Sequence, residues 1–169
     1  MRPNFTISAI IVFVLVAIDQ LIKWLVETGL AMHEIYDLLP FLALYRTHND
    51  GIAFSMFAGL GAWPLVVIAC AVLVIVLYMW SRLEANRWLS GMGFAAIVAG
   101  AIGNIIDRVL HGYVIDYVLF YVGDWSFAIF NFADALISIG AAAIILDEII
   151  HWKRGPKTTA TTKEEENHG

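Results

Sequence analysis

Four long apolar runs constrain the fold of this chain more than any other feature of its sequence. They fall at about 7 to 26, 62 to 81, 88 to 108 and 132 to 151, and polar residues interrupt the third and fourth near one end. A helix of about 20 apolar residues is long enough to cross the hydrocarbon core of a bilayer. The runs therefore predict an all-α membrane protein with four transmembrane helices.

The composition agrees with a membrane protein of one domain. Of the 169 residues, 60% are hydrophobic and 15% are charged, and the mean hydropathy is +0.77, whereas roughly a quarter of the residues of a soluble domain are charged. We expect one membrane domain over residues 1–154, because four spans leave no room for a separate soluble module. The first run continues past Asp19 to Val26 without a small-residue cleavage site, so we interpret it as an uncleaved span. The single cysteine, Cys70, permits no internal disulfide and no thiolate metal cluster, and no basic patch suggests nucleic acid.

The basic residues predict the orientation in the membrane. Segments with an excess of lysine and arginine stay on the cytoplasmic side. The N-terminus, the 82 to 87 loop and the C-terminus share one side, which we therefore expect to be cytoplasmic. The tail from 155 to 169 is too polar to pack and is predicted to be disordered. The basic residues on this side are Arg2, Arg82, Arg87, Lys153, Arg154, Lys157 and Lys163.

The long loop on the outer side, residues 27 to 61, carries its own structural signals. Residues 38 to 45 are compatible with short strands at the membrane surface, which would form a small extracytoplasmic β-like cradle. Asn49-Asp50-Gly51 is a turn signal. Residues 52 to 61 are predicted to form a short interfacial helix before the second span begins.

The unusual charges of the chain all belong to one layer near the outer ends of the spans. A charge at mid-helix costs roughly 2.5 to 3.5 kcal/mol on insertion scales, so such residues usually face the interior and mark a functional pathway. Asp19 and Lys23 are four residues apart and can neutralise each other on one helical face. Asp107 and Arg108 are adjacent, about 100° apart around a helix, so they cannot serve mainly as partners for each other, and we expect one of them to anchor another group. The layer comprises Asp19, Lys23, Asn104, Asp107, Arg108, Asp116 and Asp134.

Asp116 and Asp134 differ from the rest because neither has a lysine or arginine within four residues. Two carboxyl groups close together in a low dielectric cannot both ionise comfortably, so one becomes an acid and the other a base. Such a pair can cleave peptides with an activated water and no metal. The alternative is that each aspartate caps a helix or bonds a backbone amide, and Asp134 could do so in the first turn after Asn131.

Five motifs resemble, in order and spacing, those of lipoprotein signal peptidase, the type II signal peptidase of bacteria. The resemblance implies an aspartic intramembrane protease of the inner membrane, a monomer without cofactors, that cuts prolipoproteins before a diacylglyceryl-modified cysteine. It also implies that cyclic peptide inhibitors of the family could bind. By position, Asp116 and Asp134 match the catalytic pair. The motifs are Asp19-Gln-Leu-Ile-Lys23, Asn49-Asp-Gly-Ile-Ala-Phe-Ser55, Gly100-Ala-Ile-Gly-Asn-Ile-Ile-Asp-Arg108, Val114-Ile-Asp-Tyr117 and Phe130-Asn-Phe-Ala-Asp-Ala135.

The same resemblance assigns roles to further residues. Asp19 and Lys23 match residues that stabilise the fold, and we expect Asp107 to give structural support as well. The chain has Asp50 where the family usually has threonine, and Arg46 finds no role beyond a loop position near lipid headgroups. Positions that bind substrate or inhibitor, or support the pair, are matched by Asn49, Gly51, Gly100, Asn104, Arg108 and Asn131.

Two other functions are less compatible with these residues. A small proton-coupled transporter also uses buried carboxylates, but its acids are expected at the midplane, and the sequence has no sign of an inverted repeat. A serine protease would need a lysine or histidine base beside Ser55, Ser126 or Ser138, and the chain has no Gly-x-Ser-x-Gly motif.

Overall fold

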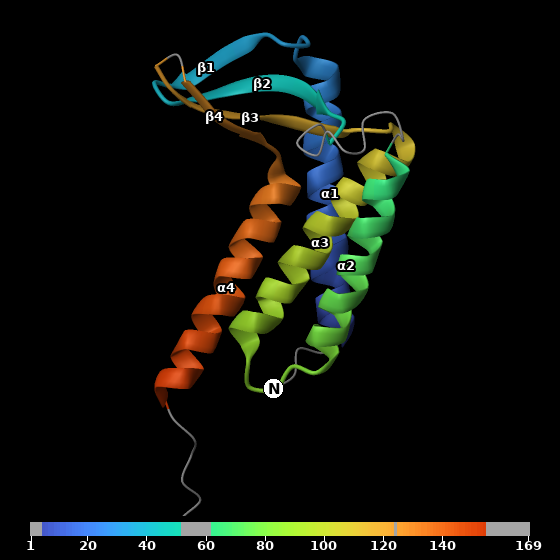
Figure 1. The fold of residues 1–169 in the computed structure, drawn as a ribbon, viewed down its shortest axis with the longest axis vertical. Coiled ribbons are helices and arrows are strands. Elements are labelled where there is room, and N and C mark those ends of the chain that lie inside the picture. The colour runs from blue at the N-terminus through green and yellow to red at the C-terminus, as the bar shows by residue number, and fades with distance from the viewer. Residues whose placement is uncertain (1–4, 52–61, 124, 155–169) are drawn as a thin grey trace, which may run out of the picture.

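The computed structural model describes residues 5–51, 62–123 and 125–154, and four long helices dominate it (Figure 1). They are α1 (Phe5–Gly29), α2 (Trp63–Ser81), α3 (Trp88–Leu110) and α4 (Phe132–Arg154). Each coincides with one of the four apolar runs, so the predicted helix count is confirmed. The predicted interfacial helix at 52 to 61 and the tail from 155 lie outside the described residues.

Among the residues that the structure describes, three helices are long and apolar enough to cross a membrane: Thr6–Gly29 in α1, α2 and α3. Their outward side chains are large and apolar, and Phe13, Trp24 and Val67 are 73%, 60% and 65% exposed. Such a surface is expected to face lipid. The chain is therefore a mostly helical membrane protein. Helix α4 carries several charged residues near its end, so a fourth span remains a prediction.

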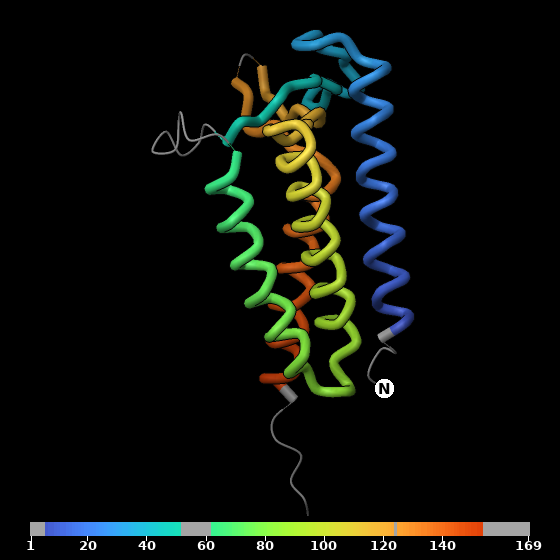
Figure 2. The backbone as a smooth tube through the Cα atoms, turned by 90° about the vertical axis from the view of Figure 1, so that its right-hand side faces the viewer, coloured from blue at the N-terminus to red at the C-terminus, as the bar shows by residue number. Residues whose placement is uncertain are grey.

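Helix α3 lies at the centre, with α1, α2 and α4 packed around it (Figure 2). Glycines bring α3 and α4 close together, as small residues do between membrane helices. A Cβ on Gly93 would lie 2.6 Å from the Gly140 carbonyl oxygen, and a Cβ on Gly140 would lie 2.5 Å from that of Gly93. Nearer the sheet, a Cβ on Gly100 would collide with the carbonyl of Ala133, so Gly100 lets the first turn of α4 sit directly on α3.

A polar clamp joins the other ends of α3 and α4. The Nε of Arg87, the residue before α3, lies 2.6 Å from Asp147 Oδ2, and its NH2 lies 2.5 Å from Glu148 Oε2. Ser90 Oγ donates to the same Asp147 oxygen at 2.5 Å. Asp147 is 4% exposed, so its charge has the partners that a buried carboxylate needs.

The four strands form one antiparallel sheet in the order β1-β2-β3-β4 across the end of the bundle (Figure 1). They are β1 (Ile35–Leu39), β2 (Leu42–Asn49), β3 (Val114–Val122) and β4 (Trp125–Phe130). Strands β1 and β2 confirm the strands predicted around 38 to 45. The pairing of Thr47 with Asp116 brings the end of β2 beside the first half of β3.

The start of α1, the α2–α3 connection and the end of α4 all lie at the end opposite the sheet (Figures 1 and 2). The described helix ends next to the three basic segments therefore lie on one side of the molecule, whereas Arg2 and the tail from 155 lie outside the described residues. Which side of a membrane they face remains a prediction.

Candidate active site

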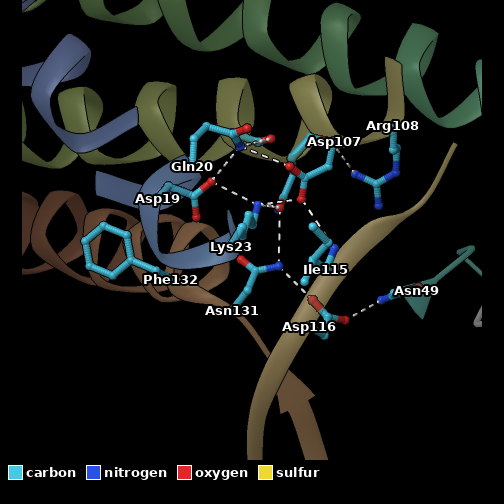
Figure 3. Close-up of polar contacts among 12 residues, drawn as sticks. Asp19, Gln20, Lys23, Asn49, Asp107, Arg108, Ile115, Asp116, Asn131 and Phe132 are labelled. Carbon is cyan, nitrogen blue, oxygen red and sulfur yellow. Dashed lines mark hydrogen bonds and ion pairs between the residues drawn. The ribbon is translucent and has the colours of Figure 1, made fainter. Parts of the chain in front are cut away.

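The two aspartates of interest come from different elements and meet at one asparagine. Asp116 lies on β3, Asp134 lies in the first turn of α4, and Asn131 lies between β4 and α4. Asn131 Nδ2 donates to Asp116 Oδ1 at 2.7 Å (Figure 3), while its Oδ1 accepts from the Asp134 backbone N–H at 3.0 Å. The fold thus brings Asp116 and Asp134 to opposite sides of one fully buried side chain.

Asp134 also takes part in the start of α4. Its Oδ2 accepts from the Asn131 backbone N–H at 3.3 Å, so Asn131 and Asp134 bond each other reciprocally, as in a capping box. The alternative that Asp134 bonds a backbone amide in the first turn is therefore present in the structure. This cap does not prevent Asp134 from acting together with Asp116, because the cap uses Oδ2 and leaves Oδ1 facing Asn104.

Asn49 holds Asp116 from the β2 side. Its Nδ2 donates to Asp116 Oδ2 at 2.9 Å, and its Oδ1 accepts from the Gly51 backbone N–H at 2.8 Å. The second bond determines which end of the amide faces the carboxylate. Gly51 has a φ of +78°, and a Cβ there would collide with Leu65 of α2, so this turn requires glycine.

A buried ion cluster lies next to Asn131 and Asp116 (Figure 3). Lys23 Nζ lies 2.9 Å from Asp19 Oδ2 and 2.7 Å from Asp107 Oδ2, and all three side chains are at most 1% exposed. Gln20 Nε2 donates to Asp107 Oδ1 at 3.0 Å and to Asp19 at 3.2 Å. The predicted Asp19–Lys23 pairing is confirmed, and the partner of Asp107 is Lys23, which the sequence did not reveal.

Asn104 connects this cluster to the aspartates. Its Oδ1 accepts from Lys23 Nζ at 3.2 Å, and its Nδ2 donates to Asp134 Oδ1 at 2.8 Å. Asn131 Nδ2 also approaches Asn104 Oδ1, at 3.4 Å. A continuous set of hydrogen bonds therefore runs from the ammonium group to both carboxyl groups.

The environment of Asp116 favours its protonated form. Burial, to 2% exposure, is the main cause that raises the pKa of Asp116 to about 6, and the nearby Asp134 charge raises it further. The hydrogen bonds from Asn49 and Asn131 act in the opposite direction and lower the pKa. Asp116 can thus hold a proton near neutral pH, which an ordinary aspartate cannot do.

Arg108 lies at the end of α3 next to the sheet, half-buried near both aspartates. Its NH1 donates to the Asn104 carbonyl oxygen at 3.3 Å, and its buried Nε has no partner among the described residues. This guanidinium group retains donors for a further acceptor. Asp107 does not pair with it, in agreement with their adjacent positions on the helix.

Arg46 has a role that the sequence analysis missed. Its NH1 donates to the carbonyl oxygens of Glu27 at 2.8 Å and Leu30 at 3.1 Å, and its NH2 pairs with the Glu27 carboxylate. A cation is favourable at a helix C-terminus, where carbonyls lack partners. Arg46 therefore ties β2 to the end of α1. The available signal was a cation in the loop of residues 27 to 61 for which the sequence analysis found no role beyond contact with lipid headgroups.

Neither a bound metal ion nor a cofactor is implied by this chemistry. In the part of the chain that the structure describes, no group of three His, Cys, Asp or Glu side chains is arranged to hold a metal ion. The absence of a cofactor remains a prediction.

Comparison with known proteins identifies the family. The family model described as signal peptidase (SPase) II matches residues 11–150. The chain belongs to the signal peptidase II family. Members of this family are peptidases, and the match agrees with the resemblance of the five motifs.

Relatives in this family match nearly the whole chain. The lipoprotein signal peptidase of Mesorhizobium japonicum is 55% identical over 148 residues, which is 88% of each chain. That of Brucella ovis is 54% identical over 147 residues, which is 87% of this chain and 92% of the relative.

Solved structures show the same fold. Two chains described as bacterial membrane enzymes superpose with TM-scores of 0.79 and 0.78, at 25% and 27% sequence identity. They match 92% and 88% of this chain and 95% and 96% of their own length. The arrangement of helices and sheet is therefore shared with known membrane enzymes.

Proposed function

We propose that this protein is an aspartic endopeptidase that removes the signal peptide from bacterial prolipoproteins by cutting before the diacylglyceryl-modified cysteine. One observation carries the proposal: Asn131 contacts both Asp116 and Asp134 where the sheet meets the helices. Membership of the signal peptidase II family supports the substrate class.

The chemistry needs only the two carboxyl groups and a water molecule. One carboxylate takes a proton from the water while the oxygen of that water attacks the scissile carbonyl carbon. The other carboxyl group, which is protonated, donates its proton to the carbonyl oxygen. The proton taken from the water then passes to the leaving nitrogen as the C–N bond breaks. The pKa of Asp116, raised to about 6, suits one member of the pair for holding a proton near neutral pH.

The substrate lies across the sheet end of the bundle in this proposal. Arg108 donates to backbone carbonyls of the extended peptide, since its Nε is unpartnered among the described residues. Asn49 and Gly51, at the end of β2, border the same peptide and hold Asp116 in place. The diacylglyceryl chains stay in lipid, so they position the cysteine at a defined depth more than they add affinity.

We place the enzyme in the bacterial inner membrane with four spans, α4 being the fourth. Both termini and the α2–α3 connection face the cytoplasm, because the basic residues gather there. The aspartates then lie near the outer face, and the signal helix of the substrate enters sideways from the bilayer. A position at the end of the helices argues against a transporter, whose acids are expected near the midplane.

The direct test substitutes each aspartate separately in the full chain. Asp116→Asn and Asp134→Asn are each expected to reduce cleavage of a lipidated precursor at least about a thousandfold, with the protein level near normal. Asp37→Asn, an exposed position in β1 of the same sheet, is the matched control and should cleave normally. Retained cleavage in either site variant would end the proposal, and a transporter would show no cleavage in any form.

A further inference from the structure

Lys23 has more acceptors than charge balance alone requires. Its ammonium group is 1% exposed and carries three N–H donors. Two of the acceptors are the carboxylates of Asp19 and Asp107, and the third is the neutral Asn104 Oδ1 at 3.2 Å. This third acceptor satisfies the last buried N–H of the ammonium group, and because it belongs to Asn104 it also connects the cluster to Asp134.

The third bond determines the orientation of the Asn104 amide. An ammonium group can only donate, so the atom that faces Lys23 must be the amide oxygen. The amide nitrogen then faces Asp134 Oδ1, at 2.8 Å, and must donate to it. A rotated Asn104 amide would place its N–H groups against the Lys23 ammonium and its oxygen against the Asp134 carboxylate, and both contacts would be repulsive.

The two aspartates consequently receive different donors. Asp134 Oδ1 accepts from an amide that is itself bonded to a cation, and such a chain polarises the donor and favours an ionised acceptor. Within residues 5–51, 62–123 and 125–154, the donors to Asp116 are the neutral amides of Asn49 and Asn131, and Asp116 is 2% exposed, whereas Asp134 is half-buried. The two aspartates therefore differ both in burial and in the donor that each receives.

We propose that Lys23 is a positioning residue for the reaction, acting through Asn104 to keep Asp134 ionised as the base while Asp116 carries the proton at rest. The inference rests on the proposed function and assigns a role to each carboxyl group. Burial of Asp116, which raises its pKa to about 6, supports the assignment independently of Lys23.

Other charged and titratable groups face the pair, and the test must separate them from Lys23. Arg108 lies near both carboxylates, but it donates its hydrogen bond to the Asn104 carbonyl oxygen, so its hydrogen bonding does not distinguish the two aspartates. The groups that face the pair are Tyr117 from β3, Asp107 and Arg108 from α3, and Asp19 and Lys23 from α1.

A double-mutant cycle on the full chain in lipid tests the relay. The first change is Asn104→Leu, and the second is Lys23→Met with Asp107→Asn, which keeps the net charge of the cluster constant. We expect each to lower kcat for a lipidated precursor peptide at least about tenfold with little change in KM. If Lys23 acts through Asn104, the combined variant is no slower than Asn104→Leu alone. Losses that multiply in the combined variant would overturn the proposal.

The pH profile is a readout that a purely structural role would not move. Asn104→Leu removes the donor to the base, and Lys23→Met with Asp107→Asn removes the cation that orients this donor. In both variants the acid limb of the kcat/KM profile should therefore move to higher pH by about one unit. The single variant Asp107→Asn measures how much of the effect of the double substitution comes from residue 107. Gln20→Met is the matched control, because Gln20 bonds Asp19 and Asp107 but not Asn104. It should lower thermal stability and leave kcat and the profile unchanged.

A spectroscopic measurement decides the assignment even where the Lys23 variant does not fold. The infrared band of a protonated carboxyl group, recorded near pH 6, should disappear in Asp116→Asn and persist in Asp134→Asn. The reverse pattern, or an unmoved acid limb in Asn104→Leu, overturns the inference. These failures differ from a failure of the proposed function, in which the unmodified protein itself would not cleave the precursor.

Discussion

At the scale of single residues, Asn131 combines structure and chemistry in one side chain. Its backbone and side chain cap α4 through Asp134, and its Nδ2 holds Asp116. The start of a helix and the spacing of two acidic groups therefore depend on the same residue. An asparagine suits this position because its amide offers one acceptor and two donors without a charge.

The pH dependence of cleavage follows from the surroundings of Asp116. The acid must be protonated, so kcat/KM should fall as the pH rises through the pKa of about 6. The bond from Asn49 lowers this pKa, so Asn49→Ala should raise it and move the basic limb to higher pH, together with a lower maximal rate. Initial rates measured across the pH range check this result.

The matched control for that profile lies elsewhere on the same sheet. Tyr121→Phe removes a hydrogen bond from the Tyr121 hydroxyl to Asp37 but touches neither aspartate of the site. Its basic limb should coincide with that of the unmodified protein. A limb that moves to lower pH in Asn49→Ala would contradict the account of Asp116.

The residue types of the site could be predicted from the sequence, but their partners could be predicted only where they are local. Asp19 and Lys23 are one helical turn apart, and the spacing alone pairs them. Asp107 reaches Lys23, and Arg46 reaches Glu27, across segments far apart in the chain. No local pattern encodes such contacts, because they depend on how the elements pack.

At the scale of elements, the helices were predictable and half of the sheet was not. The helices are 19 to 25 residues long and mostly apolar, which is close to the length that a bilayer requires. Strand β3 reads as an apolar run with one acidic residue, and its strand character depends on pairing with β2, more than 60 residues earlier in the sequence. Residues 38 to 45 were recognised because the two strands there form a local hairpin.

The contact between α3 and α4 positions Asp134, and Gly100 is the residue that permits it. In Gly100→Ala the new methyl group would meet the carbonyl of Ala133 and push the first turn of α4 away from Asn104. We expect a loss of about 1–3 kcal/mol in the free energy of unfolding and a lower cleavage rate per folded molecule. Thermal unfolding in detergent and cleavage assays measure the two effects.

Two further glycine variants separate packing from positioning. Gly29→Ala, where a Cβ would meet nothing within 4 Å, should change neither quantity. Gly140→Ala disturbs the same helix pair far from the aspartates and should lower stability more than the rate per folded molecule. Equal rate losses in Gly100→Ala and Gly140→Ala would show that position along the contact between α3 and α4 does not matter.

At the scale of the whole molecule, the two ends of the α3–α4 pair are built for different tasks. At one end Arg87 and Ser90 hold the buried Asp147. At the other end Asp116 and Asp134 are held by neutral amides and by a bridge from Lys23. Neither Asp116 nor Asp134 is neutralised directly by a cation in the described part of the chain, so both carboxyl groups remain available for proton transfer.

This polarity predicts a definite orientation, which single cysteines can test in a Cys70→Ala background. Ser126→Cys on β4, Asn86→Cys in the α2–α3 connection and Lys153→Cys at the end of α4 are all at exposed positions. In intact cells stripped of their outer membrane, an impermeant maleimide should label only Ser126→Cys. The other two should react after permeabilisation, because basic segments remain in the cytoplasm. Labelling of Lys153→Cys from outside would mean that α4 does not cross the bilayer, and it would contradict the prediction of four transmembrane helices.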